Sequence, residues 1–279
     1  MKLILLAIIM SGCAITGNTA ALEEHFNYSV YFCGKDNCIM EISKLVNESE
    51  KAVCALYSFD ETIFEKADVV NHTKLPGIMH NKFCIFDNAV WTGSYNPTGR
   101  KTIDNAVLIN STILAGIYER KFDAIKSGEK FGGGKAMLNN TAVEVYFCPD
   151  SDCIQILNEK LLDAKESIYF AAYTFTHTRI ANTLILKNLS GIIVDGVIEV
   201  SGKNSKLEML EYRGLAQKDR NRLLMHNKFW VIDEMIVITG SMNPTINGGE
   251  SNDENMIVIY DGLAAYQYNE EFRRIRDNI

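Results

Sequence analysis

The sequence repeats one ordered set of short motifs, and this duplication constrains the fold more than any other feature of the chain. The tetrapeptide VYFC at residues 30–33 returns at 145–148, and MHNKF at 79–83 returns at 225–229. The motifs follow the same order in both copies, and their period exceeds that of solenoid repeats, whose units are single supersecondary elements. Each copy is therefore expected to be a fold unit, and the chain is predicted to contain two related halves.

Each copy alternates between strand-like and helix-like segments. The VYFC motif is followed by a helix-like stretch, at 39–49 and at 154–167, and then by an apolar strand. This alternation is typical of an α/β fold. The polar, glycine-rich segment 126–140 is predicted to connect the copies. The predicted halves are residues 21–140 and 141–279.

The two copies differ in length before the histidine motif. The stretch between the apolar strand and MHNKF is much shorter in the first copy than in the second. In the second copy these extra residues predict a helix near 180–188 and a strand over 191–200. The first half is therefore expected to lack a helix–strand unit, and with it part of one wall of any cleft between the halves.

The N-terminus has the pattern of an export signal. Lys2 precedes the apolar run 3–10, which is too short to span a bilayer, so residues 1–20 are predicted to be a signal peptide. Small residues before Cys13 favour a lipoprotein cleavage site with Cys13 as the lipidated residue; cleavage near Ala20 or an uncleaved anchor are the alternatives. The protein is expected to be exported, extracytoplasmic and attached to a membrane surface.

Cysteine usage fits an oxidising compartment. Cys54 and Cys84 lie in apolar segments and are expected to be buried thiols. Four further cysteines form two C-x4-C pairs, and each pair frames a short polar loop. Metal binding by these pairs would require further His or Cys nearby. Two disulfides are therefore predicted, Cys33 with Cys38 and Cys148 with Cys153.

Each copy gathers the same chemically active side chains. Residues two apart in a strand face the same side, which groups His80 with Lys82, and Ser94 with Asn96. Imidazole has a reference pKa of about 6.5, so one histidine can attack while another donates a proton. Lysine ammonium groups and neutral donors can stabilise charge on phosphorus-bound oxygens. The set indicates phosphodiester chemistry, and the second copy repeats it with His226, Lys228, Ser241 and Asn243.

The pattern H-x-K-x4-D followed by G-S-x-N, present twice and completed by Asp87 and Asp233, resembles the signature of the phospholipase D superfamily. The resemblance covers nearly all of the chain after the signal. It implies an α/β fold with two pseudo-twofold-related α-β-α sandwich halves and the active site at their interface. It also implies no cofactor and no metal. The paired histidines predict a phosphohistidine intermediate that water releases, and the chain is expected to be a monomer with an internal pseudo-dimer.

By the same resemblance, the acidic residue before Asn in the closing strand orients a catalytic imidazole, which assigns this role to Asp104 and Glu254. The interval from His226 to Glu254 is longer than the interval from His80 to Asp104 and fits the family pattern better. The resemblance makes His80 the nucleophile and His226 the acid. Asp87 and Asp233 are expected to be structural or orienting members of the motif.

The sequence leaves the substrate open. A formal net charge of −7 and a pI near 5.3 provide no overall basic field, and the expected membrane location favours phospholipid head groups as substrate. The alternatives are a non-specific endonuclease and a non-catalytic lipoprotein that binds phosphorylated ligands. For Ser94 and Ser241, phosphate binding is favoured over a role as nucleophile. His177 is expected in a surface loop that could border the cleft.

Overall fold

The computed structural model describes residues 27–278 except 201 and 203. The predicted signal peptide at 1–20 and the lipidation site at Cys13 lie outside the described residues. Within the described part of the chain, no helix combines the length and apolar character needed to cross a membrane.

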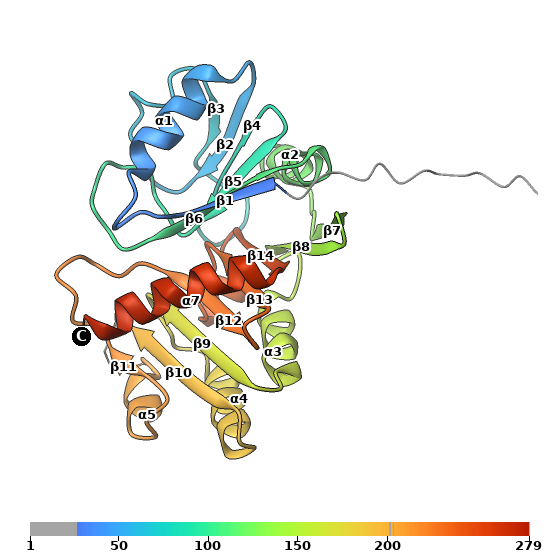
Figure 1. Ribbon diagram of the computed structural model, residues 1–279. Coiled ribbons are helices and arrows are strands. Elements are labelled where there is room, and N and C mark those ends of the chain that lie inside the picture. Colours follow the sequence, from blue (N-terminus) through green and yellow to red (C-terminus); the bar gives the residue numbers. More distant parts are fainter. Residues whose placement is uncertain (1–26, 201, 203, 279) are drawn as a thin grey trace, which may run out of the picture.

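The first half contains one helix on each side of a six-stranded sheet with the strand order β1-β6-β5-β4-β2-β3 (Figure 1). Only β2 and β3 pair in parallel; the other neighbours are antiparallel. The elements are β1 (Asn27–Phe32), α1 (Cys38–Glu48), β2 (Ala52–Leu56), β3 (Asp68–Val70), β4 (Lys82–Phe86), β5 (Ala89–Gly93), β6 (Asn105–Asn110) and α2 (Thr112–Ser127).

The second half contains an eight-stranded sheet with the order β11-β10-β9-β12-β13-β14-β8-β7. From β8 to β10 this order matches that of the first sheet, and β7 and β11 are added at its two edges. The elements are β7 (Gly133–Leu138), β8 (Thr141–Cys148), α3 (Cys153–Asp163), β9 (Ser167–Ala172), α4 (Thr178–Leu189), β10 (Ile193–Ile198), α5 (Leu207–Glu211), β11 (Gln217–Lys218), β12 (Lys228–Ile232), β13 (Ile236–Gly240), α6 (Ile246–Glu250), β14 (Glu254–Tyr260) and α7 (Gly262–Asp277).

Equivalent helices in the two halves begin with the same kind of cap. The side chains of Asn37 and Asp152 accept hydrogen bonds from the first turns of α1 and α3, and those of Ser111 and Asp261 do so for α2 and α7. Such caps satisfy backbone N–H groups that have no partner inside the helix. The local sequence therefore starts each helix directly after a strand, as the predicted alternation requires.

Three hydrophobic cores hold the layers together. A central core joins the inner faces of both sheets to α2 and α7, so the halves share one interior. A second core packs α1 on the outer face of the first sheet, and a third packs α3, α4 and α5 on the outer face of the second. The prediction of two α-β-α halves that meet at an interface is confirmed (Figure 1).

The structure changes three details of the predicted organisation. The first half lacks the helix but keeps a short strand, β3, which pairs with β2 as β10 pairs with β9. The segment expected to be an irregular connection forms strand β7 in its second part, so the second sheet begins before residue 140. Cys54 and Cys84 are not thiols but form a disulfide, because they are directly opposite each other in the β2–β4 pair.

Candidate active site

Both motif histidines lie where the two halves cross. His80 precedes β4, and its backbone N–H donates to the carbonyl oxygen of Asp253, 2.8 Å away, in the second half. His226 precedes β12, and its N–H donates to the carbonyl oxygen of Ile103, also at 2.8 Å, in the first half. Each histidine is therefore held by the segment of the other half that leads into β14 or β6.

The two acidic residues pair with the histidines across the halves. Nδ1 of His80 lies 2.7 Å from Oε2 of Glu254, and Nδ1 of His226 lies 2.9 Å from Oδ1 of Asp104. The comparison of each histidine with the carboxylate of its own half was therefore wrong as a guide to the histidine's partner. The segments that cross between the halves bring each carboxylate to the histidine of the other half. A carboxylate acceptor requires Nδ1–H, which leaves Nε2 of each ring for a substrate.

The motif serines support these carboxylates and do not face the opening. Oγ of Ser94 donates to Asp104 Oδ1 at 2.6 Å, and Oγ of Ser241 donates to Glu254 Oε2 at 2.6 Å. Both serines are fully buried. The prediction that the motif Ser and Asn side chains face the same side was wrong, because β5 and β13 end at the glycine directly before each serine. At Gly93 a Cβ would come within 2.3 Å of the Asn105 carbonyl oxygen, so only glycine permits this close turn.

The motif asparagines lie in two different hollows. Asn96 lines a central hollow of about 420 Å³, whose walls include His226, Asp104, Arg100 and both Tyr57 and Tyr173. Asn243 lines a separate polar hollow of about 600 Å³. Of the two predicted Ser–Asn sets, the structure thus brings only Asn96 to the hollow beside a catalytic candidate.

Both motif lysines are buried beneath the histidines. Nζ of Lys82 donates to the His80 carbonyl oxygen at 2.7 Å, and Nζ of Lys228 donates to that of His226 at 2.6 Å. Burial lowers the pKa of Lys82 to about 8 and that of Lys228 to about 7, although Glu254 and Asp104 act in the opposite direction. A bound anion would offset this desolvation, which is what a phosphate site requires.

The pKa values of the histidines show that the four residues form one electrostatic unit. Burial is the largest cause that lowers the pKa of His226 to about 4, and the positive charge of Lys228 is the next. Burial also lowers the pKa of His80, followed by the charge of Lys82. Lys228 contributes to the lowered pKa of His80, and Lys82 to that of His226. The two copies therefore build one site.

The motif aspartates lie in turns at the other end of their strands. Asp87 and Asp233 both have φ of 52° and follow β4 and β12. Asp87 accepts a hydrogen bond from the backbone of Lys51, and Asp233 accepts bonds from three successive backbone N–H groups at 165–167. Neither contacts a histidine. The contacts of both aspartates are structural turn contacts and lie away from the histidines.

Two tyrosines lie next to the histidines. The ring of Tyr57 lies 4.9 Å from that of His80, and the ring of Tyr173 lies 4.7 Å from that of His226, both edge-on. Tyr57 is 47% exposed and both rings line the central hollow. Their equivalent positions in the two copies were a signal for the site. By contrast, His177 directly precedes α4 without a side-chain capping bond and does not line this hollow.

Asparagines that follow the two acidic residues fasten the interface. Nδ2 of Asn105 donates to Asn227 Oδ1 at 2.8 Å, and Nδ2 of Asn255 donates to Thr92 Oγ1 at 2.6 Å. All four groups are buried. Because each bond joins one half to the other, the pair fixes the register in which the histidines meet the opposite carboxylates.

A buried charged cluster lies behind His80. Nζ of Lys121, on α2, lies 3.1 Å from Asp150 and 2.9 Å from Asp253, and all three side chains are 2–4% exposed. Asp253 also accepts a bond of 3.1 Å from Nδ2 of Asn81. At the equivalent position before Asp104 stands the apolar Ile103. Sequence reasoning missed this cluster because it is not repeated.

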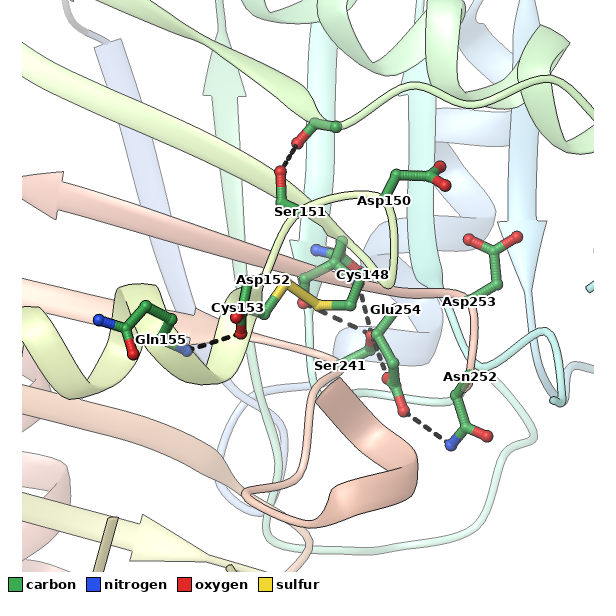
Figure 2. Close-up of a disulfide and its surroundings, with 12 residues drawn as sticks. Cys148, Asp150, Ser151, Asp152, Cys153, Gln155, Ser241, Asn252, Asp253 and Glu254 are labelled. Atoms are coloured by element: carbon green, nitrogen blue, oxygen red, sulfur yellow. Dashed lines mark hydrogen bonds between the residues drawn. A yellow bond between two sulfur atoms is a disulfide. The ribbon is translucent and has the colours of Figure 1, made fainter. Parts of the chain in front are cut away.

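The loop disulfides adjoin the two orienting carboxylates. Cys33 is joined to Cys38 and Cys148 to Cys153. The backbone N–H of Cys33 donates to the Asp104 carbonyl oxygen at 2.8 Å, and Cys148 is directly opposite Glu254 in the β8–β14 pair. Figure 2 shows the second disulfide beside Ser241 and Glu254. Each C-x4-C loop thus anchors the strand end that carries an orienting carboxylate.

Comparison with known proteins agrees with this geometry. A family described as cardiolipin synthase, PLD-like domain, matches residues 157–276. A phospholipase D from Rickettsia prowazekii is 31% identical over 171 residues, which are 56% of this chain and 83% of that protein. The chain belongs to the phospholipase D superfamily. A mitochondrial cardiolipin hydrolase from Xenopus tropicalis is 29% identical over 119 residues, 41% of this chain and 57% of that protein.

The fold resembles that of a solved structure. Phosphatidylserine synthase from Haemophilus influenzae superposes with a TM-score of 0.71 over 88% of this chain and 86% of that chain, at 11% identity. As a member of the superfamily, the chain is a hydrolase of the phosphodiesterase type. In the described residues, no group of three or more His, Cys, Asp or Glu side chains is arranged to hold a metal ion.

Proposed function

We propose that the protein hydrolyses phospholipid head groups, with His80 as nucleophile and His226 as general acid. The observation that carries this proposal is the pair of imidazoles, each oriented by a carboxylate of the other half and each above a buried lysine. Two imidazoles with free Nε2 atoms can divide attack and protonation between them. The lysines supply positive charge for the phosphate oxygens, so the proposal requires no metal.

The proposed reaction has two steps. Nε2 of His80 attacks phosphorus, the bond to the head-group oxygen breaks, and Nε2–H of His226 protonates that oxygen. Water then attacks phosphorus while His226 takes its proton, and the P–N bond to His80 breaks. The phosphodiester anion raises the pKa of His226, because a nearby negative charge favours the imidazolium. The proton needed in the first step is therefore held when substrate is present.

The substrate class rests on the relatives. Proteins named phospholipase D and mitochondrial cardiolipin hydrolase match this chain, and the second name includes a lipid. The exposed aliphatic side chains of Ile78 and Leu224, 48% and 45% exposed, precede His80 and His226 by two residues each. Apolar groups on both sides of the histidines suit a substrate with acyl chains. The membrane attachment through Cys13 stays a prediction, which the mass of the mature N-terminus tests.

The test is release of phosphatidic acid from mixed phospholipid vesicles in the presence of EDTA. We expect release by the parent protein, and loss of at least about 1,000-fold in His80→Asn and His226→Asn. His72→Asn is the matched control, because His72 is exposed and lies outside the hollow. No release from any of several head-group classes by the parent protein would refute the phospholipid substrate.

The alternative is a non-specific endonuclease. The half-exposed ring of Tyr57 and the guanidinium of Arg100 line the same hollow, and bases stack on aromatic rings while phosphates attract arginine. Degradation of plasmid and single-stranded DNA in EDTA, together with absent phosphatidic acid release, would favour the nuclease. If neither substrate nor a simple chromogenic phosphodiester is cleaved, the non-catalytic binding protein is favoured instead.

A further inference from the structure

The rim of the central hollow beside His226 carries a cluster of positive side chains. Two segments form this rim, 100–103 of the first half and 220–225 of the second, and they run side by side in parallel through a bridge between Ile103 and Met225 (Figure 1). The N–H of Ile103 donates to the Leu224 carbonyl oxygen at 2.8 Å. The cations on these segments, called the basic rim below, are Arg100, Lys101, Arg220 and Arg222, and all four are exposed.

The charges of the basic rim are not neutralised within the protein. Across residues 27–278, apart from 201 and 203, none of the four cations takes part in an ion pair with a carboxylate. Arg100 lines both the central hollow and a second hollow, which Lys101 also lines. Gly34 lines this second hollow and a third one, whose walls include Arg220 and Arg222. Positive charge thus extends outward from the site, on a chain with net charge −7.

Exposed leucines accompany the cations. Leu223 is 36% exposed and Leu224 is 45% exposed, and Leu224 lines the same hollow as His226. The segment therefore places two arginines and two leucines directly before a catalytic histidine. Side chains that bind anions next to aliphatic side chains are the combination that suits the headgroup and acyl boundary of a bilayer.

The opposite rim, beside His80, does not repeat this charge. Counted back from the carboxylates and the histidines, the positions of Arg100 and Arg222 are taken by Glu250 and Pro76. Lys74, the equivalent of Arg220, donates to the carbonyl oxygen of Ser127 at 2.9 Å. The aliphatic character is kept on both sides, by Ile78 and Leu224, but the free positive charge is confined to one.

We propose that the basic rim and Leu223–Leu224 dock on an anionic phospholipid bilayer and present the lipid phosphate to His226. The inference rests on the proposed phospholipid substrate and adds the surface on which that substrate is met. Anionic lipids attract arginine and lysine near the membrane surface, and the leucines enter the boundary region. A nucleic acid would use the same charges but would leave Leu223 and Leu224 without an apolar partner.

Sedimentation with phosphatidylcholine vesicles, with and without phosphatidylglycerol, tests the proposal on the full chain. Each cation near an anionic surface strengthens binding about 5-fold, so Arg220→Gln/Arg222→Gln is expected to bind phosphatidylglycerol vesicles about 30-fold more weakly. The matched control is Lys44→Gln/Lys165→Gln, which removes two exposed cations that do not line the hollow and is expected to bind like the parent. All variants share residues 1–26, so any contribution of that segment cancels.

The leucines give an independent readout. Leu223→Ser/Leu224→Ser is expected to weaken binding at high salt, where the arginine contribution is screened. Equal binding to neutral and anionic vesicles, unchanged by the arginine substitutions, would overturn the docking surface even if phosphatidic acid is released. Binding to anionic vesicles without hydrolysis would support the surface and refute the proposed function. If the arginine substitutions weaken DNA binding and leave vesicle binding unchanged, the rim serves nucleic acid and the proposal fails.

Discussion

Replacing Lys228 by methionine is expected to stabilise the protein while abolishing its activity. The Lys228 side chain is 2% exposed, and burial lowers its pKa from 10.5 to about 7. At pH 7 the unfolded chain keeps its ammonium fully charged, so this shift costs about 4 kcal/mol of folding free energy. Lys228→Met removes that cost and loses one hydrogen bond, to the His226 carbonyl oxygen, worth about 1 kcal/mol.

The expected net gain for Lys228→Met is about 3 kcal/mol, measured as a higher urea midpoint at constant m-value. Because the folded pKa is lower than the unfolded one, the cost is complete below pH 7 and disappears as pH rises through 10.5. The advantage of methionine should therefore shrink toward pH 10. The pKa of His226, followed by NMR, should rise in this variant, since the charge of Lys228 is among the causes that lower it.

The matched substitution Lys121→Met is expected to have the opposite sign. Lys121 is equally buried but forms ion pairs with Asp150 and Asp253, and its removal leaves two buried carboxylates without a cation. Such a loss costs about 3–5 kcal/mol. If Lys228→Met destabilises the protein as much as Lys121→Met does, the ammonium of Lys228 is compensated in the free protein and the reasoning is refuted.

Further predictions follow from the pairing across the halves. Asp104→Asn should lower kcat about 100-fold or more, because the His226 ring loses its carboxylate. The turn variant Asp87→Asn should keep most of the activity. Equal losses in the two variants would contradict the cross-half assignment. Tungstate, a phosphate analogue, should raise the melting temperature of the parent protein by binding near the buried lysines, and should do so less in Lys228→Met. An identical shift in both proteins would place the anion elsewhere.

The sequence predicted the fold, and it singled out the motif histidines and lysines that the structure brings together, because both copies repeat them. The motif histidines and lysines are read from a single short motif in each half, and each lysine is the first residue of a buried strand. The partners of the histidines could not be read in this way. Asp104 and Glu254 belong to motifs of their own halves, and only the crossing of segments at Ile103 and Asp253 assigns them to the opposite imidazole.

Other features depended on strand register or occur only once. The Cys54–Cys84 disulfide follows from the pairing of β2 with β4, which residue types alone do not specify. The Lys121 cluster and the basic rim each combine residues of both halves and lie beside one histidine only, so the repeat gave no signal for them. The motif serines were misplaced because a glycine-specific close approach ends the strand early and turns their hydroxyls to the carboxylates.

The central claim is that one histidine from each half performs a shared two-step phosphodiester cleavage. The most direct measurement is capture of the covalent intermediate with bis(p-nitrophenyl) phosphate, quenched in alkali and mapped by peptide mass spectrometry. We predict an arylphosphoryl adduct on His80, which accumulates in His226→Asn if water attack is slowed and is absent from His80→Asn. An adduct on Ser94 or Ser241, or turnover in His80→Asn at the rate of the parent protein, would contradict the claim.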